Sequence, residues 1–237
     1  MAIFGFAAGS SAKSGSLQTD TLASNNGNLE MTFVGHGSLM FKCQDKIIHI
    51  DPVSREGDYS KLPKADLILV THEHGDHLDT DLIEQLRKPG TVIIVSASCA
   101  NRVPGAIIMK NGDNRDVLGM NIKAVPAYNI IHMRSENNPY HPKGNGNGYI
   151  IRCGDKNIYV AGDTENTPEM KALTHIDVAF LPMNLPYTMT PEMVADAAKA
   201  FKPAILYPYH YGNTDTQKLL ELLKSEKQIE VRIRDLQ

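Results

Sequence analysis

One stretch at the end of a short apolar run constrains this chain more than any other part of the sequence. Residues 66–70 read DLILV, as in a strand that is covered on both faces, and residues 71–77 then read THEHGDH. Three histidines and two acids in seven residues are too many polar ligand groups for an ordinary strand end. Because side chains alternate along an extended backbone, the imidazoles of His72 and His74 are expected to point to one side.

The last part of this stretch indicates a second ligand position. Gly75 allows a sharp bend, so that Asp76 and His77 can face another point nearby. Imidazole and carboxylate together suit zinc, iron or manganese. A helical His-Glu-x-x-His zinc site is excluded, because it requires a histidine where this chain has Asp76. The stretch therefore predicts half of a two-metal site, in preference to a histidine-rich loop that binds nothing.

The composition fits a globular protein and excludes several functional classes. The chain has 237 residues, 42% of them hydrophobic, enough to bury a sizeable core in one large domain or two small ones. A formal net charge of -3 offers no basic field for nucleic acid, and no apolar run approaches the ~20 residues of a membrane span. The three cysteines lie far apart, and their odd number rules out a fully paired disulfide framework. A small-molecule substrate is the expected partner, and assembly into a homo-oligomer stays open.

The first 28 residues differ in composition from the rest. Residues 1–12 are apolar and small, like the last part of a secretory signal, but lack its positively charged start. A tract rich in Ser, Thr, Asn and Gly follows, which is typical of a linker. We therefore expect a flexible leader over 1–28, one domain over 29–237, and an exported or periplasmic location in preference to a cytoplasmic one.

From residue 29 onwards, apolar runs and turn residues alternate in an order that occurs twice. In the first half, β-rich runs predict an antiparallel meander, a further strand, a helix capped by Asp79 and another strand. These strands are expected at 31–34, 38–43, 46–50, 66–70 and 91–95. The second half adds a helix opened by Thr190 and Pro191 and a last helix opened by a capping box of Thr214 and Gln217. Its strands are expected at 121–125, 148–153, 156–161, 177–181, 204–207 and 229–233.

This repeated order predicts an α/β fold in which two β-sheets pack face to face. Helices outside each sheet would cover every remaining apolar face, which gives four layers in the order αββα. The long polar loop at 130–147 exceeds the usual length of a connection, and such loops are commonly functional or disordered.

Three further polar groups follow apolar runs in the second half, where α/β folds gather ligands. Asp163 stands in a Gly-Asp-Thr turn, His210 ends the run at 205–209, and the long loop contains His132 and His141. Taken singly, Asp163 reads as a turn cap and His210 as a buried histidine bonded to backbone. Taken together, they supply the missing half of a shell around two metals.

In this order of ligand groups, the sequence resembles the metallo-β-lactamase-fold hydrolase superfamily from about residue 29 to the C-terminus. Asp51 matches the aspartate that members of this superfamily have at the end of an early strand. Three stretches, 125–129, 140–144 and 209–211, resemble compact zinc-dependent hydrolases related to ascorbate-6-phosphate lactonase. The resemblance implies two mixed sheets and two divalent metal ions, with zinc favoured and manganese or iron as alternatives.

The resemblance also implies a ligand for each position around the metals. The first metal would be bound by His72, His74 and a third histidine, and the second by Asp76, His77 and His210, with Asp163 bridging both. Relatives often place the third histidine directly after Pro-Ala-x, where this chain has Asn129. We choose His141 over His132, because His141-Pro142 before a Gly-rich turn resembles the ligand of the compact subgroup.

Two metals at such a site favour hydrolysis by a hydroxide held between them, which would attack a small ester, lactone or phosphodiester. Asp76 is expected to orient this nucleophile and pass a proton to the leaving group. Asp51 is expected to fix a histidine tautomer from behind, with a simple cap before Pro52 as the alternative. Residues in loops near the metals are candidates for substrate contact: Tyr128, Asn129, Asn184, Tyr187 and His36.

Other functions on the same fold are weaker candidates. An iron-dependent thiol oxygenase or diiron oxidoreductase is disfavoured by the intact Asp76-His77 pair and by the lack of a following flavin-binding domain. A nuclease is disfavoured because the chain lacks a basic arm. A metal-binding sensor without catalytic activity is disfavoured by the nearly complete set of ligands.

Overall fold

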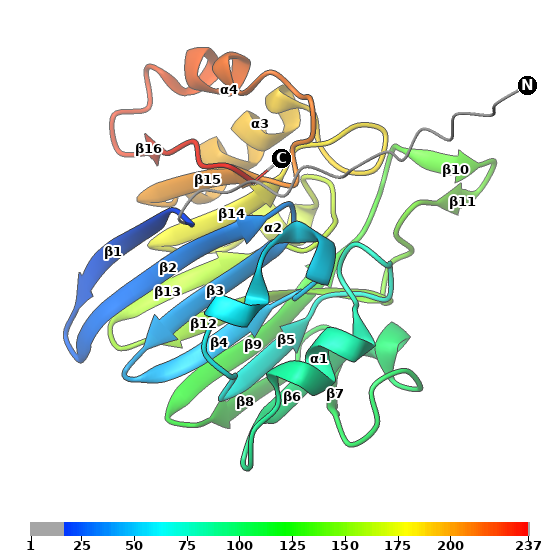
Figure 1. The fold of residues 1–237 in the computed structure, drawn as a ribbon. Coiled ribbons are helices and arrows are strands. Elements are labelled where there is room, and N and C mark those ends of the chain that lie inside the picture. The colour runs from blue at the N-terminus through cyan, green and yellow to red at the C-terminus, as the bar shows by residue number, and fades with distance from the viewer. Residues whose placement is uncertain (1–16, 237) are drawn as a thin grey trace, which may run out of the picture.

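Two mixed β-sheets of seven strands each form the centre of the computed structural model, which describes residues 17–236 (Figure 1). The first sheet contains, in spatial order, β1 (Thr19–Ser24), β2 (Gly27–Gly35), β3 (Ser38–Cys43), β4 (Lys46–Ile50), β5 (Leu67–Val70), β6 (Val92–Ser96) and β7 (Ile107–Met109). The second contains β16 (Glu230–Val231), β15 (Ile205–Tyr209), β14 (Val178–Pro182), β13 (Lys156–Val160), β12 (Gly146–Cys153), β9 (Met120–Ala127) and β8 (Asn114–Val117).

Each sheet combines an antiparallel part with a parallel part. Strands β1 to β4 pair antiparallel and β4 to β7 pair parallel. In the second sheet, β8, β9, β12 and β13 pair antiparallel, and β13 to β16 pair parallel. A meander followed by parallel strands therefore occurs twice, which agrees with the predicted repeat of the element order and with the mixed sheets that the resemblance implied.

Helices cover the outer faces, which confirms the predicted layers (Figure 1). Strand β5 is covered on both faces in this arrangement: Leu67 and Leu69 join the core between the sheets, whereas Ile68 and Val70 pack against α1. The α-helices are α1 (Thr80–Leu86), α2 (Pro168–Lys171), α3 (Pro191–Phe201) and α4 (Thr216–Leu223). Short 3-10 helices span Ser54–Glu56, Tyr59–Lys61 and Ala97–Cys99, and a separate hairpin is formed by β10 (Met133–Ser135) and β11 (Asn138–Pro139).

The observed helix caps agree with the predicted caps at two helices and differ from the prediction at a third. Asp79 accepts a hydrogen bond from the Leu82 backbone N–H at the start of α1, and Thr190 caps α3. The predicted capping box of Thr214 and Gln217 is wrong. Helix α4 instead begins at Thr216, with Asp215 as its cap, because the Asp215 carboxylate accepts from the Gln217 backbone N–H.

The predicted leader over residues 1–28 is wrong for its second part. Strand β1 pairs along its length with β2, and the carboxylate of Asp20 on β1 forms an ion pair with Arg234 at 2.7 Å. The tract is polar because β1 is an edge strand whose side chains alternate between exposed and half-buried. The domain therefore includes β1, and the signal-like segment 1–12 lies outside the described residues.

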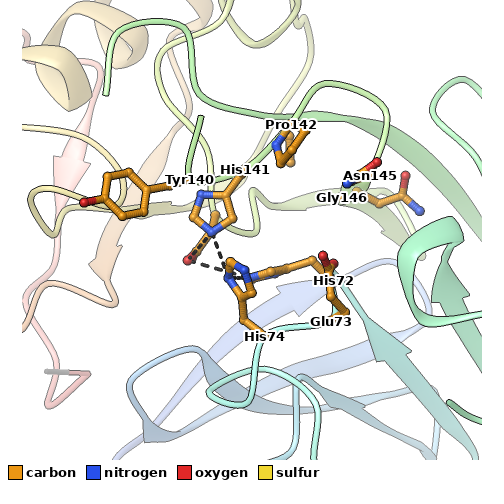
Figure 2. Close-up of a pocket in the computed structure, with 11 residues that line it drawn as sticks. His72, Glu73, His74, Tyr140, His141, Pro142, Asn145 and Gly146 are labelled. Carbon is orange, nitrogen blue, oxygen red and sulfur yellow. Dashed lines mark hydrogen bonds and ion pairs between the residues drawn. The ribbon is translucent and has the colours of Figure 1, made fainter. Parts of the chain in front are cut away.

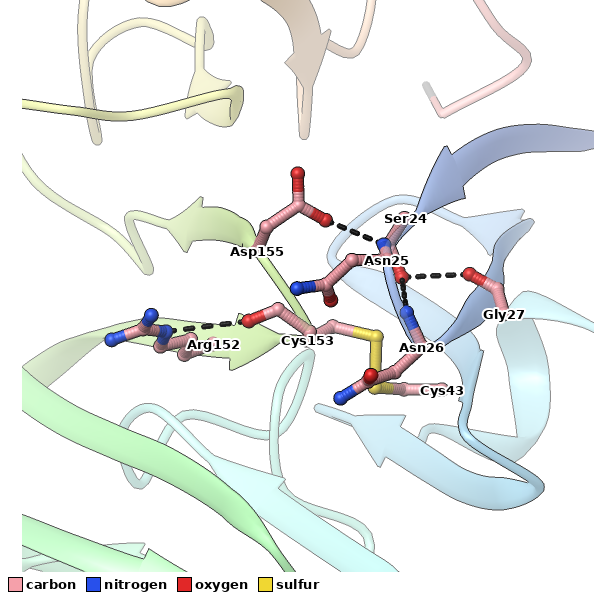
Figure 3. The surroundings of a disulfide bond; sticks show 9 residues. Ser24, Asn25, Asn26, Gly27, Cys43, Arg152, Cys153 and Asp155 are labelled. Atoms are coloured by element: carbon pink, nitrogen blue, oxygen red, sulfur yellow. Dashed lines mark hydrogen bonds between the residues drawn. A yellow bond between two sulfur atoms is a disulfide. The ribbon is translucent and has the colours of Figure 1, made fainter.

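A disulfide that the cysteine spacing did not reveal joins the two sheets (Figure 3). Cys43 ends β3 and Cys153 ends β12, and their Cα atoms are 5.9 Å apart across a sequence separation of 110 residues. Cys99 is a free, buried thiol. Among the helices of residues 17–236, none has the length and apolar character that crossing a membrane requires.

Candidate metal centre

The predicted ligand residues meet at one edge of the two sheets, where strands end. His72, His74, Asp76 and His77 follow β5, Asp163 follows β13, and His210 directly follows β15. Parallel strands deliver their carboxyl ends to a common edge, so residues far apart in the chain converge there. The long loop before β12 brings His141 to the same place.

Four of these residues form a first group around one point. The ring nitrogens His72 Nε2 and His141 Nε2 each lie 3.2 Å from His74 Nδ1, and His141 Nε2 lies 3.2 Å from Asp163 Oδ2. Figure 2 shows His141 facing His72 and His74 across a small pocket that these three residues help to line. Ligands about 2.05 Å from a tetrahedral zinc ion would be about 3.3 Å from one another, so this spacing fits such an ion.

A second group lies on the other side of Asp163. His210 Nε2 is 3.4 Å from Asp76 Oδ2, and His77 Nε2 is 3.3 Å from Asp163 Oδ1. His36, in the turn between β2 and β3, joins this group with its Nε2 3.3 Å from Asp76 Oδ2. From the sequence, His36 was predicted only as a substrate contact. The structure makes it a fourth candidate metal ligand of this group.

Unpartnered buried atoms show that these residues fit divalent metal ions. Among the described residues, His77 Nε2, His210 Nε2 and Asp163 Oδ1 are buried and make no hydrogen bond. Burying such atoms without a partner costs about 1–3 kcal/mol each, more for a charged group. A cation between them would remove that cost, and imidazole with carboxylate is a donor set that zinc, manganese and iron accept.

The electrostatics of the centre keep His72, His74 and Asp163 in the state that binds metal, and leave on His77 a proton that a metal would displace. Burial and the neighbouring histidines lower the pKa of His72, and burial lowers that of His74, so both imidazoles are neutral near pH 7. Burial would raise the pKa of Asp163, but the adjacent His210 and His77 outweigh it and lower that pKa well below 3.8. Burial opposes protonation of His77, yet Asp163 and Asp51 raise its pKa well above 6.5 in the metal-free chain.

Asp51 supports the centre from behind, at the place where it was predicted. Its fully buried carboxylate lies 2.7 Å from His77 Nδ1 and accepts from the Thr71 backbone N–H at 2.7 Å. The Nδ1–H of His77 therefore points away from the centre and leaves Nε2 for a metal. Gly37 packs on the same ring, since an added Cβ would lie 2.7 Å from His77 Cε1.

His141 is oriented by a chain of contacts that ends at Glu165. Its Nδ1 and its backbone N–H both donate to Asn129 Oδ1, at 2.7 and 2.9 Å. The Asn129 amide in turn donates to the buried carboxylate of Glu165 at 3.1 Å. His132 lies outside both groups, because its Nδ1 donates to Glu165 at 2.7 Å.

A pocket of ≈ 300 Å³ opens above the centre. Its lining residues are His74, Gly75, Asp76, Arg134, Tyr140, His141, Asp163 and Tyr187. Of the remaining predicted substrate contacts, only Tyr187 lines this pocket. Asn129 instead holds His141, the buried Tyr128 donates its hydroxyl to Glu169 at 2.9 Å, and Asn184 packs against Gly212.

Sequence reasoning missed Glu165, Arg134 and Tyr140. A signal was present for Glu165, since a second acid stands two residues after Asp163 at the same strand end. Tyr140 belongs to the stretch 140–144 that carried the resemblance, but no substrate contact was predicted for it. Arg134 carried no signal, because only the hairpin within the long loop brings it to the pocket.

Comparison with known proteins agrees with this geometry. A model of the beta-lactamase superfamily domain matches residues 30–210. The UPF0173 metal-dependent hydrolase of Pelotomaculum thermopropionicum is 32% identical over 194 residues, which are 78% of this chain and 85% of that protein.

Two solved structures extend the similarity to the fold. A protein of Parabacteroides distasonis described as a metal-dependent hydrolase is 47% identical with a TM-score of 0.89, over 94% of this chain and 100% of that one. The metallo hydrolase Igni18 of Ignicoccus hospitalis is 26% identical with a TM-score of 0.69, over 88% and 95%. A relation to ascorbate-6-phosphate lactonase stays a prediction. The chain belongs to the beta-lactamase superfamily, with the metallo-β-lactamase fold, and is a relative of the UPF0173 metal-dependent hydrolases.

Proposed function

We propose that this protein is a hydrolase that holds two divalent metal ions, zinc by preference, and cleaves a small ester, lactone or phosphodiester. The observation that carries the proposal is the convergence of two ligand groups on Asp163, with buried nitrogen and oxygen atoms that have no other partner. Relatives of this chain are named as metal-dependent hydrolases, and these names support the same reaction class. The first metal would be held by His72, His74 and His141, and the second by Asp76, His77 and His210, with Asp163 between them.

The protein's own residues would prepare and orient the reaction. Divalent metals bound here would lower the pKa of a bound water toward about 7 and polarise the oxygen of the scissile bond. Asp76 is 30% exposed to the pocket and its pKa is lowered: burial opposes this, and the adjacent imidazoles of His210 and His36 outweigh it. Its carboxylate therefore stays ionised and can accept a hydrogen bond from the attacking water. Asp51 and Asn129 would hold His77 and His141 in the tautomers that present Nε2.

Metal content and chelation test this proposal directly. Protein purified without added metal should contain close to two zinc or manganese ions per chain. It should hydrolyse members of a panel of chromogenic esters, lactones and phosphodiesters, lose that activity in chelator, and regain it when metal returns. A single iron ion per chain with oxygen uptake on a persulfide would contradict the hydrolase.

Two histidines of the same loop provide a matched control. His141→Ala should lose one metal ion and the activity, because it removes a ligand from the first group. His132→Ala should keep both metal ions, since His132 contacts Glu165 instead of the centre. Full metal content in His141→Ala would contradict the assignment of ligands.

A further inference from the structure

The β10–β11 hairpin places a cationic side chain at the rim of the pocket above the metal centre. Arg134 on β10 lines this pocket together with His74, Asp76 and His141. In Figure 1 the hairpin projects from the body of the two sheets, and it belongs to neither of them. The ligand groups do not use Arg134, so its presence in the lining calls for another role.

The guanidinium of Arg134 has no acidic partner among residues 17–236. It lies over the ring of Tyr140, whose centroid is 5.5 Å from Arg134 Cζ. By contrast, Lys143, a few residues later, forms an ion pair with Glu169 at 2.6 Å. An arginine that lies over an aromatic face keeps the N–H groups along its edge available for a planar or tetrahedral anion.

The hairpin that carries Arg134 is held in place before any ligand arrives. Tyr140 packs edge to face against Tyr187, with ring centroids 5.1 Å apart, and both rings line the pocket. At the base of the hairpin, the Glu165 carboxylate accepts from the backbone N–H groups of Ile131 and His132, each at 2.7 Å. Arg134 is exposed, but it projects from an ordered rim, and a rim of this kind loses less entropy when a ligand binds.

The charge balance of the pocket also favours an anion. Within residues 17–236, its only acidic lining residues are Asp76 and Asp163, and both belong to the candidate metal centre. Two divalent ions would more than neutralise these two carboxylates, so Arg134 would add to a positive field at the entrance.

We propose that Arg134 forms an anion subsite, and that the substrate carries a phosphate or carboxylate group in addition to the bond that is cleaved. The edge of the guanidinium binds this group in a bidentate manner, while Tyr140 and Tyr187 flank the adjoining part of the substrate. This assignment of a substrate class rests on the proposed hydrolase function.

A pair of esters that differ in one remote charge tests the subsite. Metal-loaded protein is assayed with p-nitrophenyl acetate, with the mono-p-nitrophenyl ester of succinic acid, and with p-nitrophenyl phosphonoacetate. Arg134→Gln should lower kcat/KM for the two anionic esters about ten- to a hundred-fold and leave the neutral ester within about three-fold. Arg134→Lys should retain part of the preference, because lysine keeps the charge but not the bidentate fork. Arg115→Gln removes an exposed arginine on β8 and should change none of these values.

Equilibrium binding separates this subsite from the hydrolase proposal. Phenylphosphonate, which is not hydrolysed, should bind metal-loaded Arg134→Gln about ten-fold or more weakly than the wild type or Arg115→Gln, as measured by calorimetry. Equal affinity, or an equal loss of kcat/KM for neutral and anionic esters, would overturn the subsite and leave the hydrolase standing. If the metal-loaded wild type cleaves none of these esters and none of the lactones and phosphodiesters of the panel, the hydrolase fails, and the phenylphosphonate measurement still decides whether Arg134 binds anions.

Discussion

Replacing Glu165 by glutamine tests how the protein holds His141 ready for a metal ion. Glu165 touches no ligand position itself, and acts through Asn129, which accepts from His141. Glutamine has nearly the same shape but replaces one acceptor oxygen by an NH₂ group. We expect Glu165→Gln to weaken the proposed metal site that contains His141 and to leave the other proposed site nearly unchanged.

The magnitude follows from the hydrogen bonds that the carboxylate accepts. Its Oε1 accepts from the backbone N–H and the ring of His132 and from Asn129, and its Oε2 accepts from Ile130 and Ile131. An amide leaves at least two of these donors facing another donor, and bonds to a charged group contribute about 1.5–3 kcal/mol each. Ile130 and Ile131 are exposed, so water can replace part of the loss, which leaves a local cost of about 2–3 kcal/mol. Loss of such a supporting contact lowers metal affinity about 10- to 100-fold.

Competition titration of the metal-free protein with zinc and a chelator measures the two binding steps. One step should weaken by that factor in Glu165→Gln, while the other stays within about three-fold. Asn129→Ala should weaken the same step, and the double variant should be little worse than either single variant, because both act through one contact.

A carboxylate remote from the centre provides the control. Asp20 on β1 is largely buried and accepts from Arg234 and from the Tyr207 hydroxyl. Asp20→Asn should lower the free energy of unfolding without changing either binding step. If Glu165→Gln and Asn129→Ala bind both metals with wild-type affinity, or if Asp20→Asn weakens one step equally, the reasoning is refuted.

Three further predictions follow from other contacts. Gly37→Ala should displace the ring of His77, because the new Cβ would lie 2.7 Å from Cε1, and metal analysis should show loss of one ion from a folded protein; two ions would contradict this. Reducing the Cys43–Cys153 disulfide should lower the free energy of unfolding by up to about 4–5 kcal/mol, because it releases a 110-residue loop in the unfolded chain. Guanidinium denaturation with and without reductant measures this, and an unchanged midpoint would refute it. Burial lowers the pKa of His49 from 6.5 to about 4, so the unfolded metal-free chain takes up a proton between these values that the folded chain does not. Stability should therefore fall by about 3 kcal/mol from pH 7 to pH 4, and His49→Gln should flatten that slope in urea denaturation.

The disulfide also bears on where the protein resides. A bond between two buried cysteines persists in an oxidising compartment and is rare where glutathione keeps thiols reduced. We propose an exported location on this ground, which cell fractionation would test.

The parts of the fold that the sequence predicted are those with local signals. The strand at 66–70 was recognised from its continuous apolar run, and the structure shows that both of its faces are covered. The cap at Asp79 and the cluster from His72 to His77 were readable because each is contained within one turn or one strand end. Local patterns of this kind do not depend on what the rest of the chain does.

The parts that escaped depend on partners distant in the sequence. Strand β1 looks like a polar linker until β2 is present to accept its backbone hydrogen bonds. The disulfide joins cysteines 110 residues apart, and no spacing rule selects Cys43 and Cys153 over Cys99. The same limit applied to Asn129, which looked like a loop residue facing substrate and instead supports a ligand 12 residues later.

Three residues of the centre adopt a backbone conformation that glycine would adopt more easily, and their side chains explain why they are not glycines. His36, Asp51 and His210 all have positive φ, at 50°, 43° and 48°, a conformation that costs a non-glycine residue about 1 kcal/mol or more. Each stands at or just beyond a strand end, and two of the turns hold each other, since the His210 backbone N–H donates to the His36 carbonyl at 3.2 Å. Glycine would adopt these turns without strain but would offer neither an imidazole nor a carboxylate. The paired sheets therefore offset a local strain whose effect is to turn the side chains of His36 and His210 towards Asp76 and that of Asp51 towards His77.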